Sequence, residues 1–149
     1  HSGGRTMGLE TFFMGPYETA LEPDELLVEL EVAPLPPGMG SAYLRAARFE
    51  RPSLGVAVAA AQHNGRLTDV RLAVSCVGPV PMRLRQLESR LQGATLADGQ
   101  QILRDAQRHY TEVLKPVDDL HGSVVYKTYL TGVLLGRALA QAVGTNGRN

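Results

Sequence analysis

Asp119, His121 and Ser123 are the residue types of an acid–base–nucleophile triad, and they lie at alternate positions of the segment DDLHGSVVYKTYL. In such a triad the histidine activates the serine hydroxyl and the carboxylate orients the histidine. Neighbours this close in sequence reach that geometry only in an unusual loop. The same residues suit the start of a helix, because Gly122 permits a tight turn, Ser123 can cap free N–H groups and acids favour the helix N-terminus. We therefore favour a helix cap over an independent hydrolase.

The other reactive side chains predict no second kind of site. Cys76 is the only cysteine; this excludes an internal disulfide and predicts a reducing compartment, the cytoplasm. It lies within an apolar run, so we expect a buried, unreactive thiol. The four histidines have no HxxxH-type spacing, and no metal site is expected.

Composition places the chain among ordinary globular domains. It has 149 residues, of which 44% are hydrophobic and 20% charged, the size and make-up of one domain. Its 15 basic and 15 acidic side chains cancel, so no long-range field draws in nucleic acid or an anionic membrane. Arg83, Arg85 and Arg90 alternate with leucines, which is typical of the solvated face of an amphipathic helix. The apolar run 124–143 is interrupted by charged residues, and we expect no membrane span.

The first half of the chain predicts strands. Extended segments are expected at LETFF, LLVELEV, SAYLRAARF, LGVAVAAAQ and RLTDVRLAVSCV. Asn64-Gly65 joins the last two, and this dipeptide is a strong hairpin signal because both residues tolerate a positive φ. The proline-rich stretch APLPPGMG predicts a loop.

The second half predicts helices. MRLRQLESRL carries one stripe of leucines, and Gly93 ends it. Thr95 and Asp98 have the spacing of a capping box, which begins a helix that ends at Lys115. A last helix is expected over 124–143. Strands followed by helices predict an α+β two-layer sandwich: a mainly antiparallel sheet of three to five strands, with three helices packed on one face.

Four blocks of the sequence, in order, resemble one family. They are TFFMGPYETALEPDELLVELEV, SAYLRAARF, RLTDVRLAVSCVGPVPMRLRQLESRLQG and DDLHGSVVYKTYLTGVLLGRAL. They are similar to the C-terminal domain of the FAD-binding (medium) subunit of molybdenum hydroxylases, the carbon monoxide dehydrogenase and xanthine dehydrogenase family. The likeness extends over about residues 5–143. In the last block His121 and Lys127 stand where the family usually has arginines.

The resemblance implies a role in electron transfer within an oxidoreductase. In such enzymes a molybdenum cofactor and iron–sulfur clusters in the large and small partner subunits pass electrons to FAD, which reduces an acceptor. An N-terminal FAD-binding domain holds most of the flavin, while the C-terminal domain shields it and contacts the partner subunits. We accordingly expect an FAD-dependent flavoprotein domain that is not catalytic alone.

The resemblance also implies three residues near the flavin. Tyr17 lies in the GPYET turn, Leu27 ends the ELL motif, and Arg45 stands where the family usually has a lysine. Each has a plainer interpretation, as a turn tyrosine, a core leucine and a solvated strand residue. Phe49 follows Arg48 where the family has a second arginine.

The domain organisation is expected to be simple. Residues 1–4 are interpreted as an expression remnant and leader, 5–143 as the family domain and 144–149 as a flexible tail. Because the chain enters an extended stretch directly, we expect it to be a fragment of a longer subunit. The alternative is a stand-alone, non-enzymatic interaction module of the same fold, without flavin affinity and with an exposed apolar patch.

Overall fold

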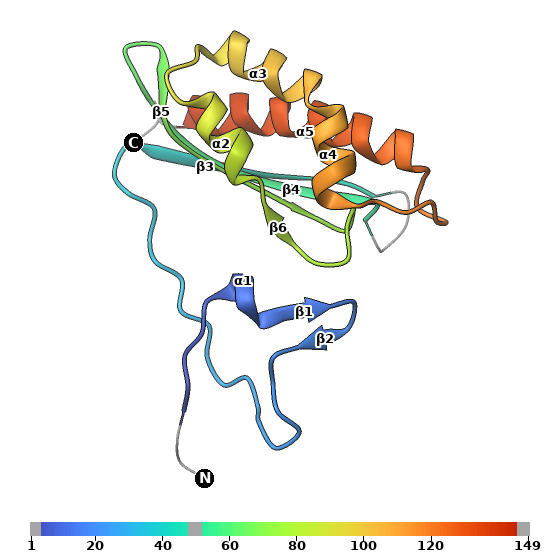
Figure 1. Ribbon diagram of the computed structural model, residues 1–149. Coiled ribbons are helices and arrows are strands. Elements are labelled where there is room, and N and C mark those ends of the chain that lie inside the picture. The colour runs from blue at the N-terminus through green and yellow to red at the C-terminus, as the bar shows by residue number, and fades with distance from the viewer. Residues whose placement is uncertain (1–3, 48–51, 146–149) are drawn as a thin grey trace.

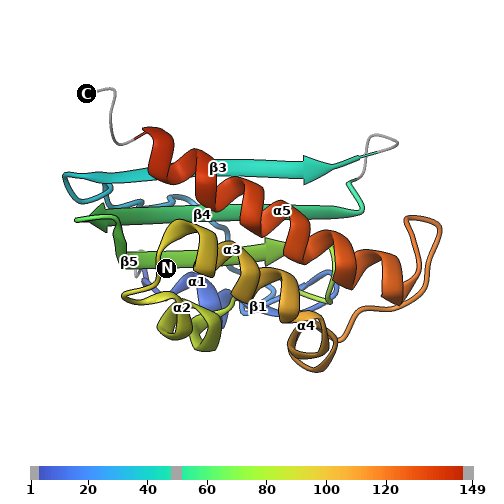
Figure 2. The same ribbon diagram turned by 90° about the horizontal axis from the view of Figure 1, so that it is seen from above.

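The computed structural model describes residues 4–47 and 52–145. In chain order its elements are α1 (Leu9–Phe12), β1 (Phe13–Gly15), β2 (Glu18–Thr19), β3 (Met39–Ala46), β4 (Leu54–His63), β5 (Arg66–Ser75), β6 (Met82–Arg83), α2 (Arg85–Leu91), α3 (Leu96–Asp105), α4 (Gln107–Leu114) and α5 (Val124–Thr145). Helices α2 to α5 cover one face of the main sheet, while the segment containing α1, β1 and β2 lies on the other side (Figures 1 and 2).

The main sheet is antiparallel with the strand order β3-β4-β5-β6, and β1 and β2 form a separate pair. Asn64 and Gly65 connect β4 to β5 with φ values of 49° and 76°. Both values lie in the left-handed region that a tight hairpin turn requires. The predicted hairpin is therefore confirmed.

The core lies between the sheet and its helices. Along β4, Leu54, Val56, Val58 and Ala60 are buried at alternate positions, which places them on the helix side. They pack with leucines from every helix of the layer, including Leu87, Leu91, Leu103, Leu114, Leu135 and Leu139. One sheet with helices on one face confirms the expected α+β two-layer sandwich.

The helical layer differs from the expectation in one respect. The helix predicted from Thr95 to Lys115 is broken at Ala106, whose ψ of 15° departs from helical values, so four helices follow the sheet. The Tyr110 hydroxyl donates to the Leu103 carbonyl at 2.8 Å beside the break. At the same place a Cβ on Gly132 of α5 would lie 2.7 Å from the Leu103 oxygen. The break thus falls beside a close approach of α5.

The N-terminal segment departs further from the sequence prediction. LETFF forms the short helix α1 before β1 begins, and LLVELEV has no strand at all. A strand needs a neighbour to accept and donate its backbone hydrogen bonds. Residues 26–35 make no backbone hydrogen bond with another described residue. The prediction of a strand at LLVELEV is wrong for this chain.

Candidate functional site

The face of the sheet turned away from the helices carries small side chains. Residue pairs across the strands place Arg45, Gly55 and Ser75 in one row, and Tyr43, Ala57, Ala73 and Arg83 in the next. A third row holds Ser41, Ala59 and Arg71. Cross-strand partners lie on the same face of a sheet. We call this surface the open face.

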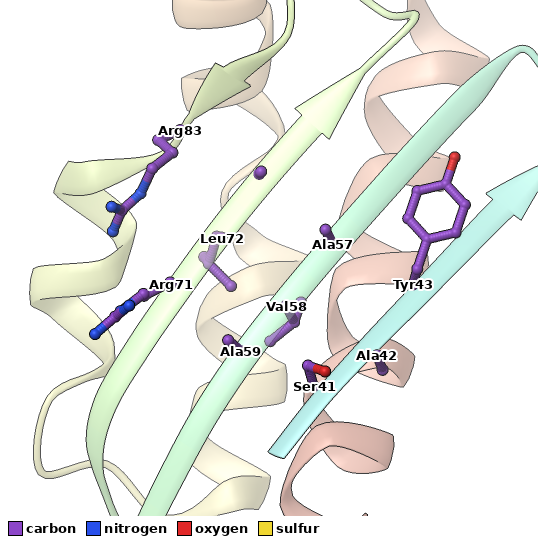
Figure 3. A pocket seen from close by; sticks show the side chains of 10 residues that line it. Ser41, Ala42, Tyr43, Ala57, Val58, Ala59, Arg71, Leu72 and Arg83 are labelled. Carbon is purple, nitrogen blue, oxygen red and sulfur yellow. The ribbon is translucent and has the colours of Figure 1, made fainter. Parts of the chain in front are cut away.

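A shallow depression of about 360 Å³ lies on the open face. Ala57 and Ala59 lie between its two sides (Figure 3), and Ala73 also lines it. Their methyl groups leave the backbone surface nearly flat. The ring of Tyr43 stands at one side, and Arg71 and Arg83 stand at the other. A flat apolar floor between an aromatic ring and two cations suits a planar group or an apolar segment with acidic neighbours.

Arg83 is held in place by Glu88. Its Nε and Nη2 donate to the two carboxylate oxygens at 3.0 and 2.6 Å, and the backbone N–H of Leu72 also donates to Glu88 at 2.9 Å. The pKa of Arg83 is raised, chiefly by this hydrogen bond. A bidentate pair fixes both the position and the plane of a guanidinium group. Arg71 is paired more loosely, with Asp69 at 3.2 Å.

Gly55 allows Tyr43 to lie close to the sheet. A Cβ at this position would be 2.6 Å from Ser75 Oγ and 2.7 Å from the Tyr43 hydroxyl oxygen. Distances this short exclude a side chain unless both neighbours move. Because Gly55 has no side chain, the Tyr43 side chain can lie close to the sheet at the border of the depression.

The three residues implied by the family resemblance lie on three different segments. Arg45 is exposed on the open face, paired across the strands with Gly55. Tyr17 is 93% exposed in the turn between β1 and β2, with φ of 62°. Leu27 is exposed in the extended segment that precedes β3, which excludes the interpretation as a core leucine. Arg48 and Phe49, which bear on the double-arginine motif, lie outside the described residues.

Both N-terminal candidates belong to the segment that lies on the open-face side of the sheet (Figure 1). An ion pair of 2.6 Å between Glu10 of α1 and Arg85 of α2 links this segment to the rest of the domain. The segment is itself tied together by Arg5, which contacts Glu25 at 2.6 Å. That contact lowers the pKa of Glu25 to about 2.

Asp119, His121 and Ser123 serve the start of α5. The backbone N–H of His121 donates to Asp119 at 2.8 Å, and the N–H of Tyr126 donates to Ser123 Oγ at 3.2 Å. Within the part of the chain that the structure describes, no hydrogen bond joins the side chain of one of these three residues to the side chain of another. The capping role of Ser123 is confirmed. Asp118 is a second capping residue, because its carboxylate accepts a hydrogen bond from the N–H of Val124.

Cys76 is exposed, so the prediction of a buried thiol is wrong. Strand β5 ends at Ser75, and Cys76 adopts a φ of 67° that turns the chain outward. Val77 takes the buried position instead. The apolar run around the cysteine did not reveal this turn.

Two polar residues were missed by sequence reasoning. Arg83 was assigned to a solvated helix face, yet it lies in β6 and borders the depression. Glu88 belongs to an Arg-x-x-x-x-Glu pattern that resembles the family, but no contact was predicted for it; in the structure it is buried and holds Arg83. The spacing of five residues between Arg83 and Glu88 could have indicated their contact. It does so only if the chain changes from a strand to a helix between the two residues.

The described residues bear on two further features, a metal site and a membrane span. Among them, no group of three histidine, cysteine, aspartate or glutamate side chains is arranged to hold a metal ion. Within residues 4–47 and 52–145, no helix combines the length and apolar character needed to cross a membrane.

Comparison with known proteins places the chain in a family. Residues 38–142 match the CO dehydrogenase flavoprotein C-terminal domain. The carbon monoxide dehydrogenase medium chain of Hydrogenophaga pseudoflava is 33% identical over 144 residues, which cover 95% of this chain and 49% of that protein. The xanthine dehydrogenase FAD-binding subunit of Escherichia coli O157:H7 is 26% identical over 149 residues, which cover 97% and 50%.

Solved structures agree with these relatives. Carbon monoxide dehydrogenase from Hydrogenophaga pseudoflava, in a form that lacks the Mo-pyranopterin moiety, superposes with a TM-score of 0.79 at 29% identity, over 92% of this chain and 47% of that one. Reconstituted CO dehydrogenase from Oligotropha carboxidovorans superposes with a TM-score of 0.81 at 26% identity, over 90% and 47%. The chain spans about half the length of the relatives it matches. It belongs to the CO dehydrogenase flavoprotein C-terminal domain family.

Proposed function

We propose that this chain is the C-terminal part of the FAD-containing electron-transfer subunit of a molybdenum hydroxylase. The observation that carries the proposal is the family match over residues 38–142 together with a fold shared with carbon monoxide dehydrogenases. In this proposal FAD is held mainly by an N-terminal FAD-binding domain. A large molybdenum-binding subunit and a small iron–sulfur subunit are the partners, and the assembly works in the cytoplasm.

The open face is the side of the domain that covers the flavin. Its flat alanine floor and the ring of Tyr43 fit a planar aromatic group, and Arg45 supplies a positive charge at its edge. When bound, FAD would accept electrons from the iron–sulfur partner and pass them to an external acceptor. Tyr17 and Leu27 reach the same side of the sheet, because their segment lies on the open-face side (Figure 1). The domain itself shields the ring from water and orients it.

Substitution of Arg45 tests this role. In the natural full-length polypeptide, Arg45→Ala is expected to weaken FAD binding about tenfold, because one charge-assisted contact is lost. Arg108→Ala is the matched control, since Arg108 lies on the helical layer and pairs with Glu112 at the surface. Titration with FAD, followed by quenching of flavin fluorescence, measures both affinities. Equal affinities for the two variants would exclude Arg45 from the flavin site.

The same FAD titration distinguishes the electron-transfer subunit from the alternative, a stand-alone interaction module. The exposed apolar residues of 26–32 are a patch of the kind that this alternative requires. It predicts a natural polypeptide that binds no FAD, with or without Arg45. Stoichiometric flavin in the purified protein supports the electron-transfer subunit.

A further inference from the structure

Residues 26–32 have one apolar side and one acidic side. Alternate side chains along an extended chain point in opposite directions. On one side stand Leu26, Val28, Leu30 and Val32, which are 84%, 90%, 70% and 85% exposed. On the other side stand Leu27, Glu29 and Glu31. This is the pattern of a strand that covers a core with one face and meets water with the other.

The backbone N–H and C=O groups of the segment also lack partners in the described part of the chain. Residues 26–35 form no backbone hydrogen bond with another described residue. The segment runs on the side of the sheet opposite the helical layer and leads from the β1–β2 pair back to the start of β3 (Figure 1). A row of open N–H and C=O groups beside an apolar face is a template for pairing with another strand.

The comparisons indicate what this other strand belongs to. The matched C-terminal domain begins at residue 38, after the segment. The relatives nevertheless align over 94–97% of this chain, so they share most of the segment as well. The chain covers only about half of each relative. The segment is thus a shared part of the subunit that lies outside the C-terminal domain.

We propose that residues 26–32 form a strand in a sheet of the flavin-binding half of the same polypeptide. Leu26, Val28, Leu30 and Val32 pack on the core of that half, while Glu29 and Glu31 face solvent. The inference rests on the proposed function, because it requires a flavin-binding half. In this arrangement the segment connects the two halves of the subunit, because a strand of the first half leads into β3 of the second.

A second copy of this chain is a poorer partner. Two copies of this segment paired antiparallel in one sheet would leave their shared apolar side uncovered, and a register centred on Leu30 would set Glu29 of one copy opposite Glu31 of the other. Like charges directly opposite one another destabilise a strand pair. A strand from the half of the subunit that precedes the segment need not place acidic residues opposite Glu29 and Glu31.

Hydrogen–deuterium exchange tests the proposed strand. In the 149-residue chain, the amides of residues 26–32 are expected to exchange as in an unfolded peptide. In the natural full-length polypeptide the same amides are expected to exchange at least about 100-fold more slowly, because strand pairing must open first. Equal rates in the two proteins would overturn the proposal. Slow exchange of the 149-residue chain that depends on its concentration would also overturn it, in favour of self-pairing.

Substitutions on the two sides of the strand sharpen the test. Val28→Asp combined with Leu30→Asp is expected to lower the Tm of the full-length polypeptide by about 5–10 °C, because two charges would enter a core. The same pair leaves the Tm of the 149-residue chain unchanged, since both side chains are exposed there. Glu29→Gln is the control on the solvent side and leaves both proteins unchanged. An equal loss of Tm in the 149-residue chain contradicts the proposal.

Flavin content distinguishes failure of this inference from failure of the proposed function. A full-length polypeptide that contains flavin but leaves residues 26–32 unprotected overturns the strand alone. One that protects them but binds no flavin overturns the electron-transfer role and retains the strand.

Discussion

At the scale of single residues, Lys127 shows how one buried charge organises a loop. Its side chain is 1% exposed, and Nζ lies 2.8 Å from both the Asp119 carboxylate and the Val117 carbonyl. A buried ammonium is tolerated only when such partners replace water. Lys127 thereby fixes the segment between α4 and α5, and the hydrogen bond lowers the pKa of Asp119.

The two partners of this pair are expected to respond differently to substitution. Asp119→Asn leaves the ammonium of Lys127 buried without its counter-charge and should cost about 2 kcal/mol, less than a fully buried pair because Asp119 reaches solvent. Lys127→Met keeps the apolar stem, removes the buried charge and should cost about 1 kcal/mol or less. Chemical denaturation of both variants measures the difference. A larger cost for Lys127→Met would show that the charge itself stabilises the domain.

The same pair predicts a pH dependence. Because the folded-state pKa of Asp119 lies below its ordinary value of 3.8, its stabilisation is complete above that value. It is lost as the pH falls from 3.8 through the lowered pKa. Lys127→Met should therefore lose less stability than the unmodified chain over this acid range, as followed by thermal unfolding. Parallel profiles would mean that the ion pair does not stabilise the fold.

At the scale of elements, α3 begins and α4 ends where the sequence predicts. Thr95 accepts a hydrogen bond from the N–H of Asp98 at 3.2 Å and donates to its carboxylate at 2.8 Å. Lys115 ends α4 with a left-handed φ of 46°. The break between α3 and α4 has no such signal in the sequence; it lies near the place where Gly132 of α5 comes close to the Leu103 carbonyl.

Removal of the α3 cap should destabilise the domain. Thr95→Ala leaves the first N–H groups of α3 without their acceptor and should cost about 1 kcal/mol. That cost corresponds to a Tm lower by about 3–5 °C for a domain of this size. Thr111→Ala is the matched control, because Thr111 is exposed within α4 and its hydroxyl donates to the carbonyl of Gln107 in the preceding turn of the same helix. Equal effects of the two substitutions in differential scanning calorimetry would contradict the capping contribution.

At the scale of the whole molecule, the chain consists of a packed domain and a segment that lies beside it. The core residues all come from β3 onward, and residues 4–37 contribute none of them. The exposed pair of Glu10 and Arg85 joins the two parts. Exposed ion pairs of this kind contribute little to stability.

Truncation should separate these two parts. A chain of residues 38–149 is expected to fold with a Tm within about 5 °C of the 149-residue chain, because no core residue and little more than one surface ion pair is lost. Thermal unfolding followed by circular dichroism gives the comparison. Loss of cooperative unfolding would show that residues 4–37 are an integral part of the core.

The sequence alone predicted the features that depend on neighbours in the chain. The Asn64-Gly65 hairpin and the caps at Thr95 and Ser123 follow from local backbone preference, and the two-layer architecture follows from apolar periodicity. The family resemblance rests on four blocks of sequence. These signals are contained within short windows of residues. The local structure at these positions therefore depends little on distant parts of the chain.

The tertiary structure decided the features that depend on distant residues. It brought Arg83 and Glu88 together across a strand-to-helix turn, exposed Cys76 at the end of β5 and assembled the alanine floor from two strands. LLVELEV illustrates the boundary between the two. Its alternation correctly indicates a strand-forming sequence, yet a strand exists only where a neighbour completes its hydrogen bonds, and the described part of this chain provides none.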